Sequence, residues 1–185
     1  MEIIIYMNEL RAAQCAAAKK DIRYYLNGVL YTENMLVATT GTILLRLKLQ
    51  EEQPYAADFI ISNDTIDKLV KLCGAKHAEA KLVFDVGHLT ITLPDGDNIS
   101  YAPIEGKFPD YKSVLPADQT RTQGEVAQFN PELLLQLEKA AQLYHGKSKA
   151  TYIRVYHRGS KAALVLNDND YNPDVYLGVI MPLRD

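Results

Sequence analysis

The feature that most constrains this chain is a local pattern that recurs three times at nearly equal spacing. Each time, a short apolar strand leads into an amphipathic helix, and three further strand-like segments follow. The expected helices cover residues 8–19, 63–73 and 131–145. The helices should start near residues 7, 63 and 131. The first two starts are 56 residues apart, and the second and third are 57 apart once an 11-residue stretch, 106–116, is left out of the count. This period favours an internal repeat of β-α-β-β-β units in an α+β protein, although helix-then-hairpins can also recur by chance.

Capping residues mark where these helices should begin. Asn8 is expected to cap the first helix, and Ser62 or Asn63 the second. Asn130 should cap the third, with Pro131 in its first turn. One unit alone cannot cover the face of its own sheet, so the units should pack on one another. The expected strands are 2–6, 22–31, 35–39, 43–49, 59–62, 81–86, 89–93, 98–102, 125–129, 151–156, 162–167 and 175–181.

The stretch 106–116, Gly-Lys-Phe-Pro-Asp-Tyr-Lys-Ser-Val-Leu-Pro, connects the second and third units. Pro109 and Pro116 exclude a helix and remove donors that a central strand would need. Phe108 and Tyr111 are nevertheless too apolar for a solvated linker. We therefore expect a stiff, extended strap whose side chains pack on the bodies at both ends. A ligand bound at that junction should touch the strap.

The composition limits the class of protein. Hydrophobic residues make up 48% of the 185 residues and charged residues 23%, which is typical of a soluble globular chain. The net charge of −3 excludes a uniformly basic protein but allows a local basic patch. Cys15 and Cys73 lack metal-type spacing, which suggests free thiols in a reducing compartment. No apolar run has the length of a membrane span, and the N-terminus lacks signal-peptide character, so we expect a cytoplasmic protein.

Residue patterns typical of catalysis are missing from the sequence. There is no glycine-rich phosphate loop and no nucleophile elbow. The segment 168–172 has some likeness to a calcium loop, but Pro173 and Val179 occupy positions that need Gly and Glu. We expect no enzymatic activity, no metal site and no cofactor. The histidines have no ligand-spaced neighbours either; they are His77, His88, His145 and His157.

Basic residues fall on or just after all three expected helices, on the face away from the apolar stripe. A single helix of this kind could simply have a solvated surface. Three similar placements favour contact with phosphates that does not depend on nucleotide sequence. The residues are Arg11, Lys19, Lys20, Lys68, Lys71, Lys76, Lys139, Lys147 and Lys149.

Four motifs occur in a recognisable order. They are Arg-Tyr-Tyr-Leu-Asn-Gly-Val-Leu at 23–30 with Val-Ala-Thr-Thr-Gly at 37–41, Phe-Pro-Asp-Tyr at 108–111 with Val-Leu-Pro at 114–116, Phe-Asn-Pro at 129–131, and Met-Pro-Leu-Arg at 181–184. Together they resemble the middle domain, strap and last domain of the bacterial sliding clamp family, the DNA polymerase III β subunit. The resemblance implies DNA-clamp-like pairs of β-α-β-β-β units, with helices lining a DNA channel and antiparallel sheets outside. It assigns 1–104 to a complete domain, 105–116 to the connecting strap and 117–185 to half a domain.

The resemblance also implies a binding cleft. In the family, a hydrophobic cleft between the middle and last domains captures short peptide motifs of polymerases, clamp loaders and repair proteins. These apolar positions could equally be ordinary core. Thr40, Thr42 with Ile43, and Ser113 replace charged or polar residues usual in the family, so the cleft should carry less charge. The cleft positions carried over are Leu26, Thr39, Gly41, Thr42, Ile43, Leu44, Pro109, Ser113, Val114, Val179, Ile180, Met181, Pro182, Leu183 and Arg184.

The expected function is therefore that of a non-catalytic DNA replication or repair accessory. It would bind clamp-motif peptides of a DNA polymerase or clamp loader and contact or encircle duplex DNA. The alternative is a peptide-binding regulator or decoy that forms no ring. A half-domain exposes one flank of its sheet, so we expect a homo-oligomer, either a dimer or a tetramer. Basic residues could instead keep that edge soluble; they are Lys147, Lys149, Arg154 and Arg158.

Overall fold

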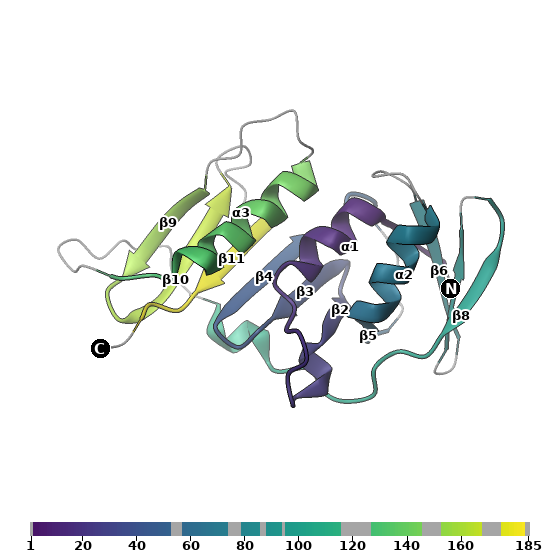
Figure 1. Ribbon diagram of the computed structural model, residues 1–185, viewed down its shortest axis with the longest axis horizontal. Helices are drawn as coiled ribbons and strands as arrows, with labels where there is room; N and C mark the ends of the chain where they lie inside the picture. Colours follow the sequence, from purple (N-terminus) through teal and green to yellow (C-terminus); the bar gives the residue numbers. More distant parts are fainter. Residues whose placement is uncertain are drawn as a thin grey trace.

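The structure is a computed structural model that describes residues 2–52, 57–73, 79–85, 88–93, 95–115, 127–145, 153–167 and 175–183. Three α-helices lie on one side of the sheets (Figure 1). They are α1 (Met7–Gln14), α2 (Asn63–Cys73) and α3 (Pro131–His145). Two short 3-10 helices, η1 (Tyr24–Leu26) and η2 (Tyr111–Val114), lie in connections. None of the helices in these ranges is both long and apolar enough to cross a bilayer.

The strands form two sheets in which every described pair is antiparallel. The smaller sheet has the order β1-β6-β7-β8, and the larger has the order β5-β2-β3-β4-β11-β10-β9. This arrangement confirms the expected α+β fold with antiparallel sheets and helices on one face. The strands are β1 (Glu2–Tyr6), β2 (Gly28–Thr32), β3 (Met35–Thr39), β4 (Ile43–Lys48), β5 (Phe59–Ser62), β6 (Glu79–Asp85), β7 (His88–Thr92), β8 (Asn98–Tyr101), β9 (Ile153–Arg158), β10 (Lys161–Asn167) and β11 (Tyr176–Ile180).

The first two units interlock by exchanging their leading strands. β1 of unit one pairs with β6 of unit two, and β5 of unit two pairs with β2 of unit one. Unit three joins through its last strand, because β11 pairs with β4 and sets Val179 opposite Leu44. The larger sheet therefore runs without a break from the first two units into the third.

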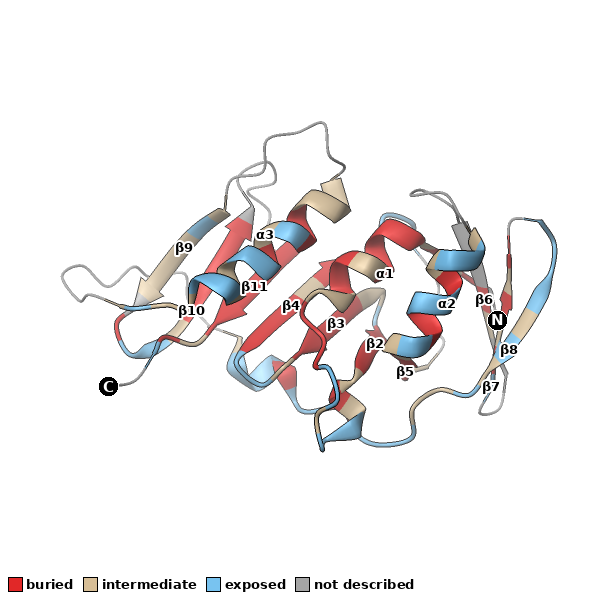
Figure 2. Cartoon of the chain, in the orientation of Figure 1, coloured by how far each residue is buried: buried red, intermediate tan, exposed pale blue. Residues whose placement is uncertain are grey.

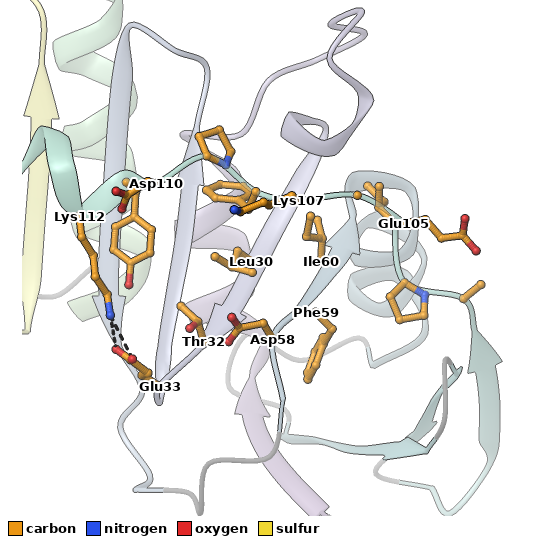
Figure 3. Close-up of a pocket in the computed structure, with 17 residues that line it drawn as sticks. Leu30, Thr32, Glu33, Asp58, Phe59, Ile60, Glu105, Lys107, Asp110 and Lys112 are labelled. Carbon is orange, nitrogen blue, oxygen red and sulfur yellow. Dashed lines mark hydrogen bonds and ion pairs between the residues drawn. The ribbon is translucent and has the colours of Figure 1, made fainter.

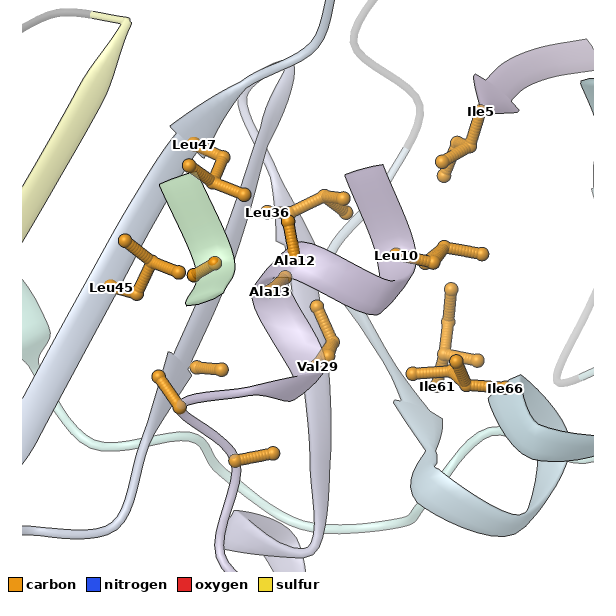
Figure 4. Close-up of a cluster of buried hydrophobic side chains, with 14 of the residues drawn as sticks. Ile5, Leu10, Ala12, Ala13, Val29, Leu36, Leu45, Leu47, Ile61 and Ile66 are labelled. Carbon is orange, nitrogen blue, oxygen red and sulfur yellow. The ribbon is translucent and has the colours of Figure 1, made fainter. Parts of the chain in front are cut away.

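The main core lies between the helices and the inner faces of the sheets (Figures 2 and 4). Leu10 of α1 and Ile66 of α2 are fully buried beside Ile5 and Ile61 of the leading strands. The alanines of α1 have short side chains, so this helix can lie close to the sheet. Burying these apolar side chains is the main stabilising contribution of this layer.

The structure confirms the expected bounds of α2 and α3 but corrects those of α1, which ends at Gln14 and not at residue 19. After Gln14, the N–H groups of Cys15, Ala16 and Ala17 bond to carbonyls three residues back, at 3.0–3.2 Å. The chain therefore tightens, and the Ala18 N–H then donates to the Leu26 carbonyl at 3.0 Å. This tertiary bond outweighs the helix propensity of the alanine run.

The helix caps differ from expectation in one case. Asn8 lies inside α1 and donates to the Tyr144 carbonyl at 3.2 Å, so it is not the cap. The Ser62 hydroxyl accepts from the Thr65 N–H at 3.0 Å and caps α2. The Asn130 carboxamide accepts from the Glu132 N–H at 2.9 Å, which confirms the expected cap of α3.

Two expected strands also need correction. The segment 22–31 begins with η1, and its strand starts only at Gly28, because paired hydrogen bonds between Asp21 and Asn27, both 2.9 Å, close a loop. In 125–129, the described part, 127–129, lies outside any strand. Its Gln128 carbonyl instead accepts from the Leu183 N–H at 2.7 Å. Residues 125, 126, 151 and 152, and the 168–172 segment compared with a calcium loop, lie outside the described residues.

Glu9 ties the start of α1 to the end of β4. Its buried carboxylate accepts from the Tyr6 N–H at 2.8 Å and from the Gln50 N–H at 2.7 Å. Burial raises the pKa of Glu9 above its ordinary value, and these two N–H donors partly offset that shift.

We expect Glu9→Ala to lower the free energy of unfolding by about 2 kcal/mol, because two partly buried backbone donors lose their acceptor. Urea unfolding of both proteins measures the difference. Glu105→Ala, which changes an exposed carboxylate, should leave stability within about 0.5 kcal/mol of the original. Equal stability of the Glu9 variant and the original would contradict this role for Glu9.

Candidate functional site

A second apolar cluster lies on the outer face of the larger sheet, away from the helices. It joins η1, the strap and the β4–β11 junction, and it contains Leu26, Leu44 and Val179 of the predicted cleft. Phe108 and Tyr111 of the strap are buried in the same cluster. The expectation that strap side chains pack at the junction is met at these two residues.

The loop between β3 and β4 forms one side of this region. The Thr39 hydroxyl donates to the Ile43 carbonyl at 2.6 Å and accepts from the Gly41 N–H at 2.9 Å. The hydroxyls of Thr40 and Thr42 are 2.9 Å apart. Gly41 has a φ of +93°, which favours glycine at this turn. The loop is therefore held by the hydroxyl groups of Thr39, Thr40 and Thr42.

The C-terminal segment runs beside this loop. The Met181 N–H donates to the Thr42 carbonyl at 3.0 Å, Pro182 is buried, and Leu183 is 56% exposed. On the strap, Pro109 and Ser113 are exposed, and Val114 is 51% exposed. The strap and the tail thus each carry an exposed apolar side chain, Val114 and Leu183.

Two of the predicted cleft residues point elsewhere. Ile43 and Ile180 lie opposite each other in the β4–β11 ladder, and both are buried in the helix-side core. Side chains alternate between the two faces of a strand, so Leu44 and Val179 face outward while their neighbours face inward. The side chains of Ile43 and Ile180 are therefore not on the cleft surface. Arg184 lies outside the described residues.

A cavity of about 620 Å³ lies between the strap and strands β2 and β5 (Figure 3), and it shares Phe108 and Tyr111 with the outer cluster. Its floor includes Leu30 and Ile60, and Pro109 of the predicted cleft lies in its wall. At its edge, the Lys112 ammonium contacts both oxygens of Glu33 at 2.8 and 3.0 Å. This exposed ion pair links the strap to the β2–β3 hairpin.

The helix side has a hollow of about 950 Å³ bounded by α1, α2, α3 and η1. Arg11, Lys19, Lys20 and Lys139 line it together, so four predicted DNA-facing residues from two units converge there. Its lining also contains the acidic Asp64 and Asp67.

The remaining predicted basic residues lie apart from this hollow or outside the described residues. Lys68 and Lys71 are exposed on α2, and the Lys68 ammonium lies 5.8 Å from the centre of the Tyr101 ring. Lys76, Lys147 and Lys149 fall outside the described residues.

Sequence reasoning missed Arg23 as a component of the β3–β4 loop. Its guanidinium lies beside Gly41, pairs with Asp21 at 2.8 Å and donates to the Thr40 carbonyl at 3.3 Å. The hydrogen bonds from Arg23 lower the pKa of Asp21 to about 2. The Asp-x-Arg spacing at 21–23 was the available signal, because Asp often accepts from the backbone two residues on.

Comparison with known proteins identifies relatives for most of the chain. No family model matches it. It is 31% identical to the beta sliding clamp of Proteus mirabilis over 119 aligned residues. This alignment covers 61% of this chain and 32% of that protein. It is 27% identical to the beta sliding clamp of Haemophilus influenzae over 169 aligned residues. This alignment covers 88% of this chain and 44% of that protein. The chain thus spans less than half the length of these curated relatives.

Solved structures agree on the fold. A crystal structure of the DNA polymerase sliding clamp from Pseudomonas aeruginosa superposes with a TM-score of 0.75 at 21% identity. The match covers all of this chain and 66% of that one. The repeated units, the antiparallel sheets and the sequence relatives point to the same conclusion. The chain belongs to the bacterial sliding clamp family.

Proposed function

We propose that this protein is a non-catalytic, clamp-like accessory of DNA replication that binds short peptides of partner proteins on its outer face and duplex DNA on its helix face. The observation that carries the proposal is the continuous sheet through β4 and β11. It joins the outer-face residues Leu44 and Val179 beneath the strap. The partners proposed are a DNA polymerase, a clamp loader or other proteins with clamp-binding motifs.

The peptide site comprises the outer cluster and its exposed flanks. Buried apolar side chains supply a floor, and Val114 and Leu183 supply exposed apolar walls. The loop hydroxyls add polar contacts without a formal charge. Such a groove suits an apolar peptide, and we propose short segments rich in Gln, Leu and Phe as its ligands.

We expect Met181→Ala and Leu183→Ala each to weaken binding of such a peptide by about 1–2 kcal/mol, because each removes apolar area from an anchor site. Fluorescence polarisation with a labelled peptide measures the affinity. Leu72→Ala is the matched control, since Leu72 on α2 is 54% exposed, close to the 56% of Leu183, but lies on the helix side. Unchanged affinity for both site variants, in folded protein, would refute this location of the site.

The helix face is proposed to contact DNA through charge alone. Arg11, Lys19, Lys20 and Lys139 line one hollow, and lysines can reach phosphates without reading bases. Affinity should therefore fall steeply with salt and be similar for all duplex sequences.

We expect Lys19→Glu combined with Lys139→Glu to weaken binding to every duplex alike and to reduce the slope of log affinity against log salt by about 2. Fluorescence anisotropy over a salt series gives both quantities. Lys107→Glu is the charge-matched control, because Lys107 lies on the strap at the outer face. Salt-insensitive binding, or strong preference for one sequence, would rule out this mode of contact.

The incomplete third unit bears on how the protein assembles. Self-association into a dimer or tetramer is proposed, because unit three is half of a paired domain.

The second candidate function is a peptide-binding decoy that does not encircle DNA. It is favoured by the mixed charge of the helix-side hollow and by Leu135, which is 60% exposed on α3. Loss of DNA binding with retained peptide binding would support the decoy.

A further inference from the structure

Unit three lacks the partner that units one and two supply to each other. In those units, the leading strand of one pairs with the first hairpin strand of the other. In unit three, the described part of the chain places no strand beyond β9, at the end of the larger sheet. Its leading segment, 127–129, likewise belongs to no described ladder. Both halves of the reciprocal pairing are therefore unfilled within the described residues.

Burial of the leading segments shows the same deficit. The residue two positions before each helix is Ile5, Ile61 or Phe129. Ile5 and Ile61 are fully buried, because the exchanged strand and the opposite helix cover them. Phe129 is only half-buried. Its apolar ring is incompletely removed from water at the rim of the core.

The helices and hairpin strands repeat this difference. The fourth helical residue is fully buried in α1 and α2, as Leu10 and Ile66, but its counterpart Leu134 in α3 is half-buried. On the first hairpin strand, Leu82 is fully buried and Val155 is half-buried. The partly covered positions all lie on the flank of unit three where a second unit would sit.

We propose that unit three pairs with unit three of a second copy of this chain across a two-fold axis, completing one domain from two halves. This proposal rests on the self-association proposed above and gives its interface. In each copy, unit three has a leading segment without a strand partner and a strand β9 without a neighbour on its outer side, within the described residues. A two-fold axis would place the leading segment of each copy beside β9 of the other, so both pairings would form at once. A different protein would have to supply both elements in matching register.

The registers of the first two units specify the contacts. Ile61 lies opposite Val29, Ile60 opposite Leu30 and Phe59 opposite Tyr31. Transferred by position, Phe129 of one copy lies opposite Ile153 of the other, and Ala127 lies opposite Val155. Between these pairs, Gln128 lies opposite Arg154 on the outer face. The α3 helices of the two copies then pack through Leu134.

Disulfide trapping tests this register. The variant carries Gln128→Cys and Arg154→Cys, with Cys15→Ser and Cys73→Ser to remove the native thiols. Residues directly opposite in an antiparallel pair have Cα atoms about 4.5–5.5 Å apart, which a disulfide can bridge. Mild oxidation should give a covalent dimer of twice the 20.8 kDa chain mass. Each single-cysteine control should stay at chain mass, and a double variant that behaves like them would overturn the proposal.

Light scattering of unmodified protein tests the same interface without cysteines. The mass should rise with concentration to that of a dimer or a multiple of it, and Leu134→Lys should return it to 20.8 kDa. Leu135→Lys is the matched control, because its counterpart in unit one is Arg11, so the position accepts a cation. A single 20.8 kDa species at high concentration, or an assembly unaffected by Leu134→Lys, would overturn the pairing.

Peptide titration separates this interface from the peptide site. The outer cluster is on the opposite face of the sheet from Leu134, so a monomeric Leu134→Lys variant should bind peptide with unchanged affinity. Unchanged affinity in the monomer supports a pairing surface distinct from the peptide site. A dimer that binds no peptide would count against the proposed function and leave the pairing intact.

Discussion

Leu137→Ala should lower the free energy of unfolding by about 3 kcal/mol, among the largest losses expected from one substitution in this chain. Leu137 is fully buried in α3, and its two methyl carbons lie 3.2 and 3.3 Å from where a Cβ on Gly178 would be. The Leu137 carbonyl also accepts from the buried Tyr176 hydroxyl at 2.6 Å. Leu137 thus holds α3 on β11 through both its side chain and its carbonyl.

The loss is expected to be large because the neighbouring residues cannot move in to fill the space that the Leu137 side chain leaves. Gly178 has no side chain, and β11 is fixed by its pairing with β4 and β10. A void left by Leu137→Ala would therefore persist, which adds a cavity cost to the lost transfer energy. Because β11 also carries Val179, we expect weaker peptide binding in the same variant.

Chemical denaturation followed by circular dichroism measures the change. The control is Leu135→Ala, two residues earlier in the same helix, where the side chain is 60% exposed and the loss should stay within about 0.5 kcal/mol. Similar stability of the Leu137 variant and the original protein would show that α3 is not held by this contact.

The helices show how far local sequence determines the fold. The bounds of α2 and α3 agree with expectation, because Ser62 and Asn130 provide caps that depend on neighbouring residues alone. The end of α1 depends on distant groups. Ala18 bonds to Leu26, and the Asn63 side chain donates to the Ala18 carbonyl at 2.8 Å. No local pattern predicts a stop that residues on other elements impose.

In the candidate site, too, some features follow from local sequence and others depend on the fold. The structure brings Leu26, Leu44 and Val179 into one apolar cluster, and short motifs predict their proximity because each motif fixes a whole strand or turn. They did not separate inward from outward neighbours, so Ile43 and Ile180 were included although both lie in the helix-side core. The two-residue period of a strand could have made that distinction. Arg23 was missed because its role depends on the fold that brings it to Gly41.

Gly28→Ala should destabilise the protein by about 3 kcal/mol, because the new methyl group would overlap backbone atoms. A Cβ at Gly28 would lie 2.5 Å from the Ile61 carbonyl oxygen and 3.1 Å from the Ile104 side chain. Ile104 lies directly before the strap, and its N–H donates to the Ile60 carbonyl at 2.9 Å, so relief would displace both β5 and the start of the strap. Gly178→Ala is the matched control, since its Cβ would lie no closer than 3.2 Å to the side chains of Leu137 and Val165, a smaller overlap than at Gly28. Thermal unfolding should therefore show a larger loss for Gly28→Ala, and the reverse order would contradict this account of the β2–β5 contact.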